Sequence, residues 1–99
     1  MKILNAATAT GAGSGYPTDR IYADHGWMIV VTGAPTAVSV TLQGSLDGIN
    51  WVTLDTSTIT TSEIRFVTGK PVVQVRANLG TLTAGTSPTV SVDYVGARA

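Results

Sequence analysis

A short segment carrying Asp47-Gly48 separates two stretches of alternating apolar and polar residues, and this arrangement constrains the fold more than any other feature of the chain. Residues 38–43 read VSVTLQ and residues 51–55 read WVTLD, each with the period of two that a half-buried strand shows. Glycine accepts the positive φ that tight hairpin turns require. The sequence therefore predicts a β-hairpin in which Asp47 and Gly48 set the strand register and Trp51 packs.

Further strands are predicted at residues 27–32, 63–68, 73–78 and 89–95, and the last three alternate in the same way. The nearly continuous run at 27–32 suits a strand buried on both faces, and the alternation at 63–68 places Ile64 and Phe66 inward. No segment carries apolar residues at helical spacing over two turns. We therefore expect an all-β chain that forms a single antiparallel β-sandwich, Ig-like or jelly-roll-like, with about six to eight strands and almost no helix.

A chain of 99 residues supports one hydrophobic core. We divide it into residues 1–19, an N-terminal arm with a first strand and a glycine-rich loop, and residues 20–99, the β-sandwich domain. The glycine-rich part, TGAGSG at 10–15, holds no core-forming side chain. It is either a linker or an arm that lies along a neighbouring subunit.

The chain is poor in charge, and this excludes several classes of partner. Only 12% of its residues are Asp, Glu, Lys or Arg, against about 25% in an average soluble domain, and six basic residues balance six acidic ones. Phosphate binding needs clustered Lys and Arg, so we expect no nucleic-acid partner.

No apolar run approaches the roughly 20 residues of a membrane span, and the first residues lack the apolar centre of a signal peptide. We expect no membrane partner and a product that stays where it is made.

No combination of residues predicts catalysis or a cofactor. His25, the only histidine, lies beside Asp24 without a nucleophile motif, and we interpret it as a turn histidine before a buried strand. There is no cysteine, and therefore no disulfide or thiolate site. Asp47, Asn50 and Asp55 lack the EF-hand spacing that would indicate calcium, so we assign Asp47 to turn chemistry. We expect no enzymatic activity, no metal and no cofactor.

Trp51 closes the predicted hairpin, and two interpretations of it stay open. In the first, its ring packs on the core or in an interface. In the second, Trp51 joins Trp27, Tyr16 and Tyr22 in a platform on which sugar rings stack, since exposed aromatic rings offer an apolar face with a polar rim.

Two families share motifs with this chain. The stretch from Val38 to Val95, with SLDGINW in its hairpin and the strand VRAN before a loop rich in Thr, Gly and Pro, resembles small β-sandwich virion proteins of tailed bacteriophages, of the capsid decoration, head-fibre or tail-associated type. The hairpin alone is also similar to that of discoidin-like carbohydrate-binding domains. The first resemblance implies a non-enzymatic structural protein on the capsid surface of the virion, made in the host cytoplasm.

We therefore expect a capsid decoration or cement protein that binds the head surface as a homo-oligomer. Its partners would be the major capsid protein or another virion protein, together with sister subunits. The alternative is a carbohydrate-binding or host-adhesion module of a tail or head fibre, with a glycan as its ligand. The residues predicted to bind partners are Lys2, Ile3, Leu4, Tyr16, Thr58, Ile59, Thr60, Leu82 and Thr83.

Overall fold

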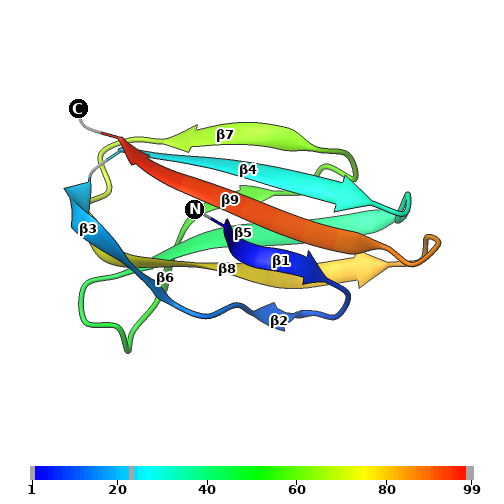
Figure 1. The fold of residues 1–99 in the computed structure, drawn as a ribbon, viewed down its shortest axis with the longest axis horizontal. Helices are drawn as coiled ribbons and strands as arrows, with labels where there is room; N and C mark the ends of the chain where they lie inside the picture. The colour runs from blue at the N-terminus through cyan, green and yellow to red at the C-terminus, as the bar shows by residue number, and fades with distance from the viewer. Residues whose placement is uncertain (1, 23, 98–99) are drawn as a thin grey trace.

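The computed structural model describes residues 2–22 and 24–97, and these contain nine β-strands (Figure 1). They are β1 (Lys2–Ala7), β2 (Gly11–Ala12), β3 (Tyr16–Tyr22), β4 (Asp24–Thr32), β5 (Ala37–Ser45), β6 (Val52–Ser57), β7 (Glu63–Val67), β8 (Val72–Thr83) and β9 (Thr89–Ala97). No helix occurs within these residues. The predicted all-β sandwich is confirmed, and the strand number exceeds the expected six to eight because the N-terminal segment contributes three short strands.

The strands form two antiparallel sheets that pack against each other (Figure 1). The first sheet has the order β1-β9-β4-β7, and the second has the order β2-β8-β5-β6 with β3 also paired to β8. The central pairs join segments far apart in the sequence, since β4 pairs with β9 and β5 pairs with β8. The hairpin loop between β5 and β6 projects from one end of the sandwich, and the loop between β8 and β9 lies at the other end (Figure 1).

The core consists of the side chains that alternate inward from both sheets, as a period of two requires. On β5 these are Val38, Val40 and Leu42, and on β9 they are Val90 and Val92. The inward face of each of these strands is the one that its alternation predicts. Burial of a Val or Leu side chain contributes about 1.5–3 kcal/mol, so this interleaved layer is the main source of stability.

Strand β4 departs from the prediction that its apolar run is buried on both faces. Trp27 and Ile29 are buried, whereas Met28 and Thr32 are exposed. The first sheet is antiparallel, and such a sheet often has one face on the core and the other in solvent. Apolar residues at consecutive positions therefore do not imply burial on both sides.

Strand β7 reverses the predicted orientation: Ile64 and Phe66 point outward and are 67% and 70% exposed. Their neighbours Glu63 and Arg65 face the gap between the two sheets instead. There Arg65 Nε donates to Asp55 Oδ2 at 2.7 Å, and Ser57 Oγ donates to Glu63 Oε2. The prediction was wrong because these polar partners lie on β6, in the other sheet.

A polar seam thus joins the edge strands β6 and β7, where the two sheets share no backbone pairing. Asp55 is its centre, because it also accepts a hydrogen bond from Trp27 Nε1 at 3.1 Å. Burial alone would raise the pKa of Asp55, but the hydrogen bonds from Arg65, Trp27 and the Thr56 N–H outweigh it, and the pKa is lowered. The seam is therefore strongest when Asp55 is ionised.

The N-terminal segment belongs to the same sandwich as the rest of the chain. Strand β1 pairs with β9 in the first sheet, and β2 and β3 pair with β8 in the second. Ile3 is buried in the core, and the Gly13 N–H donates to the Ala77 carbonyl at 2.7 Å. The segment up to residue 19 therefore bridges the two sheets along the side opposite the polar seam, while Met1 lies outside the described residues.

Candidate interaction surfaces

The hairpin loop at residues 46–51 is held in one conformation by side-chain hydrogen bonds. Asp47 Oδ1 accepts the N–H groups of Ile49 and Asn50, both at 2.8 Å, and Asp47 Oδ2 accepts Asn50 Nδ2 at 2.8 Å. Ser45 Oγ accepts the Gly48 N–H at 2.7 Å, and Gly48 has a φ of 74°. These hydrogen bonds hold the pKa of Asp47 well below its usual range. The backbone N–H of Asn50 contributes most, followed by the Ile49 N–H and then by the side chains of Asn50 and Ser45.

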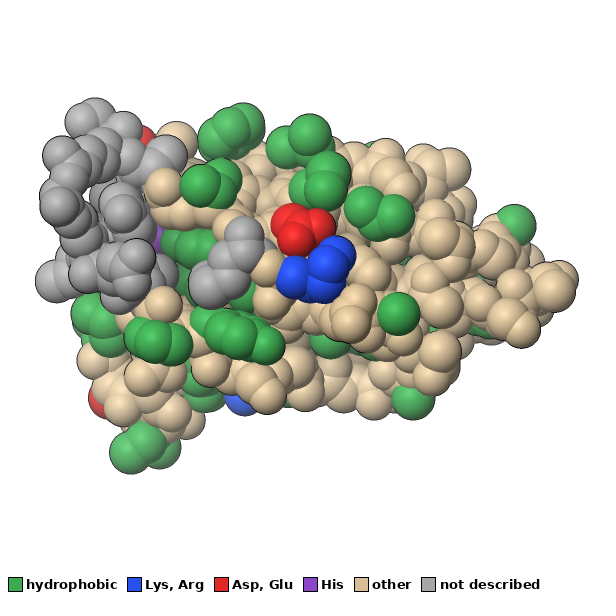
Figure 2. Space-filling model, viewed as in Figure 1, with side chains coloured by type: hydrophobic (Ala, Val, Ile, Leu, Met, Phe, Trp, Pro, Cys, Tyr) green, Lys and Arg blue, Asp and Glu red, His purple; other side chains and the backbone are tan. Residues whose placement is uncertain are grey.

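This hydrogen-bonded loop presents apolar side chains to solvent. Leu46 and Ile49 are 70% and 80% exposed, and Val52 at the start of β6 is also exposed. We call these three residues the hairpin tip. Figure 2 shows apolar side chains on the projecting loop at the lower left of the molecule. Asp47 and Ser45 accept the N–H groups of residues 48–50, so the conformation of the loop does not depend on burial of its apolar side chains.

An open pocket of about 470 Å³ lies beside the hairpin tip. It is bounded by the start of the loop, by β6 and by the turn between β7 and β8, with Leu46, Val52, Leu54, Lys70 and Val72 in its wall. Gly44 lets the wall residues Val72 and Leu54 pack closely together, since a Cβ there would lie 2.6 Å from Val72 Cγ1 and 2.9 Å from Leu54 Cδ1. The hairpin end of the sandwich therefore combines exposed apolar side chains with a hollow.

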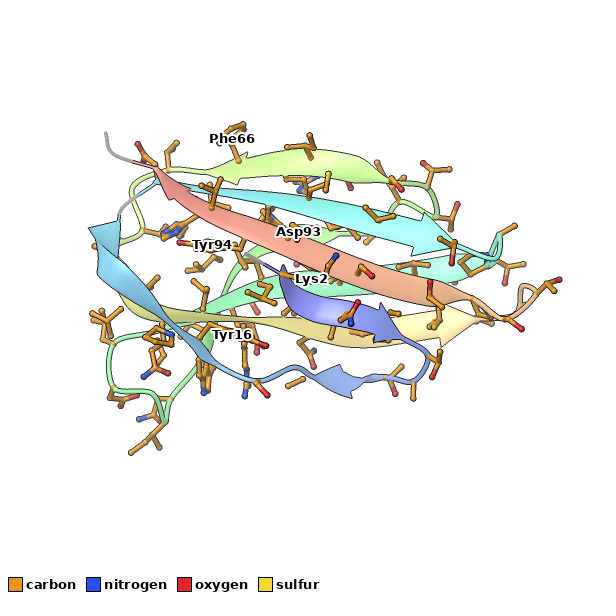
Figure 3. All side chains as sticks on the ribbon, viewed as in Figure 1. Lys2, Tyr16, Phe66, Asp93 and Tyr94 are labelled. Carbon is orange, nitrogen blue, oxygen red and sulfur yellow. The ribbon has the colours of Figure 1, made fainter. Side chains whose placement is uncertain are left out.

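A second apolar surface covers the outer face of the first sheet near its β7 edge. It consists of Met28, Ile64, Phe66 and Val95, and we call it the outer patch. Figure 2 shows apolar side chains gathered to one side of a charged pair, and Figure 3 labels Lys2 and Asp93 at the place of that pair. Phe66 points away from the sandwich (Figure 3). A shallow groove of about 260 Å³ runs across the patch beside Gly26, where a Cβ would be 3.2 Å from both Phe66 and Val95.

The residues predicted to bind partners do not form one site. Ile3 is buried in the core and is not exposed for a contact with a partner in this fold. Leu4, Tyr16 and Leu82 are half-buried and pack against the core. Lys2 is exposed and forms an ion pair with Asp93 at 3.3 Å.

The remaining predicted residues lie together at the end of the sandwich opposite the hairpin tip. Pairing of Val40 with Ser57 and of Ala37 with Thr83 brings the loop after β6 and the end of β8 to that end. Thr58, Ile59 and Thr83 are exposed there, and Thr60 is half-buried. This region stays a predicted contact surface of lower apolar content than the hairpin tip.

The aromatic residues do not form a shared platform. Trp27 is buried in the core, which excludes it from a sugar-binding surface, and the Tyr22 side chain lies outside what the structure describes. The guanidinium of Arg76 lies 4.5 Å from the centroid of the Trp51 ring and is held by Gln43 Oε1 at 2.6 Å. Gly15 lies against the end of the same ring, since a Cβ there would be 2.9 Å from it. Trp51 therefore packs between neighbouring segments.

His25 occupies a strand and not the turn that the sequence suggested. It lies on β4, fully buried, with Nδ1 2.6 Å from the Tyr94 hydroxyl and Nε2 donating to the Lys70 carbonyl at 2.7 Å. Both ring nitrogens thus contribute to the packing of β9 and of the turn before β8. Among the described residues there is no group of three His, Cys, Asp or Glu side chains that could hold a metal ion.

The sequence prediction did not include the most exposed apolar residues. Leu46 and Ile49 could have been predicted, because they flank Asp47-Gly48 inside a turn, where no strand face can bury them. The outer patch had no such signal, because its orientation depends on partners elsewhere in the chain.

Within the described residues, no helix is long and apolar enough to cross a membrane.

The arrangement defines a nine-stranded antiparallel β-sandwich with two exposed apolar surfaces, and solved structures with this fold are known. No protein-family model matches the chain, and no curated protein matches it. The SPBc2 prophage-derived protein YomS is similar, with a TM-score of 0.67 and 12% identity over 98% of this chain and 90% of that one. PirA is similar with a TM-score of 0.52 and 11% identity, over 88% and 85% of the respective chains. At these identities the likeness shows the fold alone.

Proposed function

We propose that this protein is a non-enzymatic structural component of a tailed-bacteriophage virion, and more specifically a capsid decoration protein that binds the head surface as a homo-oligomer. The resemblance of residues 38–95 to small virion proteins supports the proposal. The fold shared with a prophage-derived protein is consistent with it. The low charge of the chain also fits a protein that attaches by close packing.

The hairpin tip is the observation that carries the proposal. Leu46 and Ile49 are held outward on a loop that Asp47 and Ser45 make rigid, so little conformational entropy is lost when they bind. Burial of two such side chains contributes about 1.5–3 kcal/mol each. A single contact of this size is weak, but simultaneous attachment of several linked subunits raises avidity by about 10² to 10⁴.

The partner of the hairpin tip is the major capsid protein or another protein of the virion surface. An apolar projection beside a hollow fits a complementary groove with an apolar wall, and Lys70 at the pocket wall favours an acidic group near its rim. Charge contributes little long-range attraction, because the chain has a formal net charge of zero. Binding is therefore expected to persist at high salt.

Electron microscopy of purified particles, made with and without the protein, tests the function. The expected result is additional density on the head that is absent from particles lacking the protein. Absence of the protein from purified virions contradicts the proposal.

Two variants test the contact. Leu46→Ser with Ile49→Ser is expected to abolish co-sedimentation with particles while the fold is retained, since both side chains are exposed. The comparison variant is Ile59→Ser, an exposed isoleucine in the other predicted contact surface, at the opposite end. Contact through the hairpin tip predicts that this variant binds like the unmodified protein. If Ile59→Ser loses binding and the double variant does not, the contact lies at the Thr58–Thr60 loop.

The alternative function is a carbohydrate-binding or host-adhesion module that uses Trp51. The guanidinium of Arg76 already covers one face of the Trp51 ring, which leaves less of the ring for a sugar and weakens this alternative. A glycan array with the unmodified protein and a Trp51→Ala variant distinguishes the two, because a signal lost in the variant favours glycan binding.

A further inference from the structure

Strand β7 differs from the other edge strands in how its edge is protected. Exposed strand edges recruit further strands, and proteins blunt them with β-bulges, with lysine and with inward-pointing charged residues. Strand β1 has register shifts along its pairing with β9 and carries Lys2, and β6 has a shift in its pairing with β5. Strand β7, in contrast, pairs with β4 in regular register over all of its residues, from Glu63 to Val67. It does carry the inward-pointing charges of Glu63 and Arg65, and these protect the edge only against a strand that has no opposite charges to pair with them. Its outer edge carries no strand in the described chain.

The side chains of β7 are suited to a second copy of the same strand. A two-fold axis places residue i of one copy opposite residue j of the other, and j opposite i. When antiparallel pairing is centred on Ile64, Glu63 of each copy faces Arg65 of the other, and Ile64 faces Ile64. Opposite charges across strands are stabilising, and like charges directly opposite are destabilising. The strand is therefore self-complementary in this register.

The neighbouring register is unfavourable for the same reason. Pairing centred on Arg65 places two guanidinium groups opposite each other. The register centred on Ile64 instead forms two Glu63–Arg65 pairs on the inner face. Arg65 already lies 3.3 Å from Glu63 of its own chain and is oriented by Asp55, so the charges are in position before association. On the outer face, the same register joins the two outer patches across Ile64.

We infer that two copies of this protein associate through their β7 edges, in antiparallel register centred on Ile64, to form a continuous sheet with one shared apolar outer surface. In this dimer each first sheet continues into the other in the order β1-β9-β4-β7 followed by its reverse. Phe66 lies beside the junction on the same face as Ile64. This contact would supply the homo-oligomer of the proposed function and in that respect rests on it.

Analytical ultracentrifugation of the isolated protein over a range of concentrations tests the pairing. The unmodified protein is expected to show a monomer–dimer equilibrium. Ile64→Lys is expected to weaken association by at least about a hundredfold, because each dimer loses two isoleucine contacts and gains two opposed ammonium groups. The fold should be retained, since Ile64 is exposed.

Val95→Lys is the matched control. Val95 belongs to the outer patch but lies on β9, separated from the β7 edge by β4. Strand pairing predicts a change in association of less than about threefold, because the charge is screened by solvent at that distance. Equal loss in Val95→Lys and Ile64→Lys contradicts edge pairing and indicates that the outer patches pack face to face.

A mixture of Ile64→Lys and Ile64→Glu proteins tests the register. Only pairing centred on residue 64 places the two substituted side chains directly opposite each other, so the mixture is expected to form heterodimers while neither variant dimerises alone. Failure of the mixture to associate overturns this register.

The outcomes separate this inference from the proposed function. An unmodified protein that is monomeric at all concentrations, yet decorates particles, overturns the pairing and leaves the function in place. A dimer that never binds particles overturns the function and leaves the pairing in place.

Discussion

The orientation of β7 leads to a quantitative prediction about Phe66 and its neighbour Val67. Phe66 is 70% exposed, whereas Val67 is buried. Truncation of a fully buried phenylalanine to alanine costs about 3–5 kcal/mol. Less than a third of Phe66 is shielded from solvent, so Phe66→Ala is expected to lower the free energy of unfolding by about 1 kcal/mol or less.

Val67→Ala is expected to cost more, although it removes fewer atoms. Two buried methyl groups correspond to about 1.6 kcal/mol at about 0.8 kcal/mol each, and the cavity left behind adds to this. We expect a loss of about 2 kcal/mol. The smaller substitution is therefore the more damaging one, which is the reverse of what side-chain size alone predicts.

Urea unfolding followed by tryptophan fluorescence measures both variants. Trp27 is buried and reports loss of the core. The measurement is made on dilute protein, so that association through β7 does not contribute to the free energy. A cost of 3 kcal/mol or more for Phe66→Ala, equal to or above that of Val67→Ala, would show that Phe66 is a core residue and refute the orientation described here.

Three further predictions concern the polar seam and the turns. The folded pKa of Asp55 is below its unfolded value of about 3.9, so the unfolded chain binds more protons as pH falls through that value. The stability that Asp55 contributes is therefore present above this pH and is lost below it. Asp55→Asn should make the free energy of unfolding depend less on acid pH, as measured by urea unfolding at several pH values. Gly33→Ala should lower the melting temperature far more than Gly69→Ala. Both glycines have positive φ, but only at Gly33 would a Cβ lie 2.5 Å from Pro88 Cα, and equal melting temperatures would contradict the close packing of the turn. Asp47→Ala removes the acceptor of the hairpin loop, and limited proteolysis should cleave that loop faster than in the unmodified protein, whereas an unchanged rate would mean that the loop is rigid without it.

The exposed apolar residues were predictable only where the signal was local. Leu46 and Ile49 lie inside a turn that Asp47-Gly48 identifies, and a turn cannot bury both. Ile3 shows the opposite case, because a short N-terminal segment rich in small residues resembles a free arm in sequence. It is buried since β1 pairs with β9, about 90 residues later in the chain.

The sequence by itself determined the strands from β4 onward, the hairpin and the inward face of β5. Alternation at Val38, Val40 and Leu42 and the positive φ of Gly48 are local properties, and short-range sterics and side-chain period decide them.

Only the tertiary structure decided which face of β7 is buried and where His25 lies. An alternating strand can bury either of its faces, and a polar face is buried when partners satisfy it. Asp55 and Ser57 satisfy Arg65 and Glu63 from the other sheet, and Tyr94 and the Lys70 carbonyl satisfy His25. These partners come together only through the packing of two sheets, so Ile64 and Phe66 point outward to the surface proposed to join two copies.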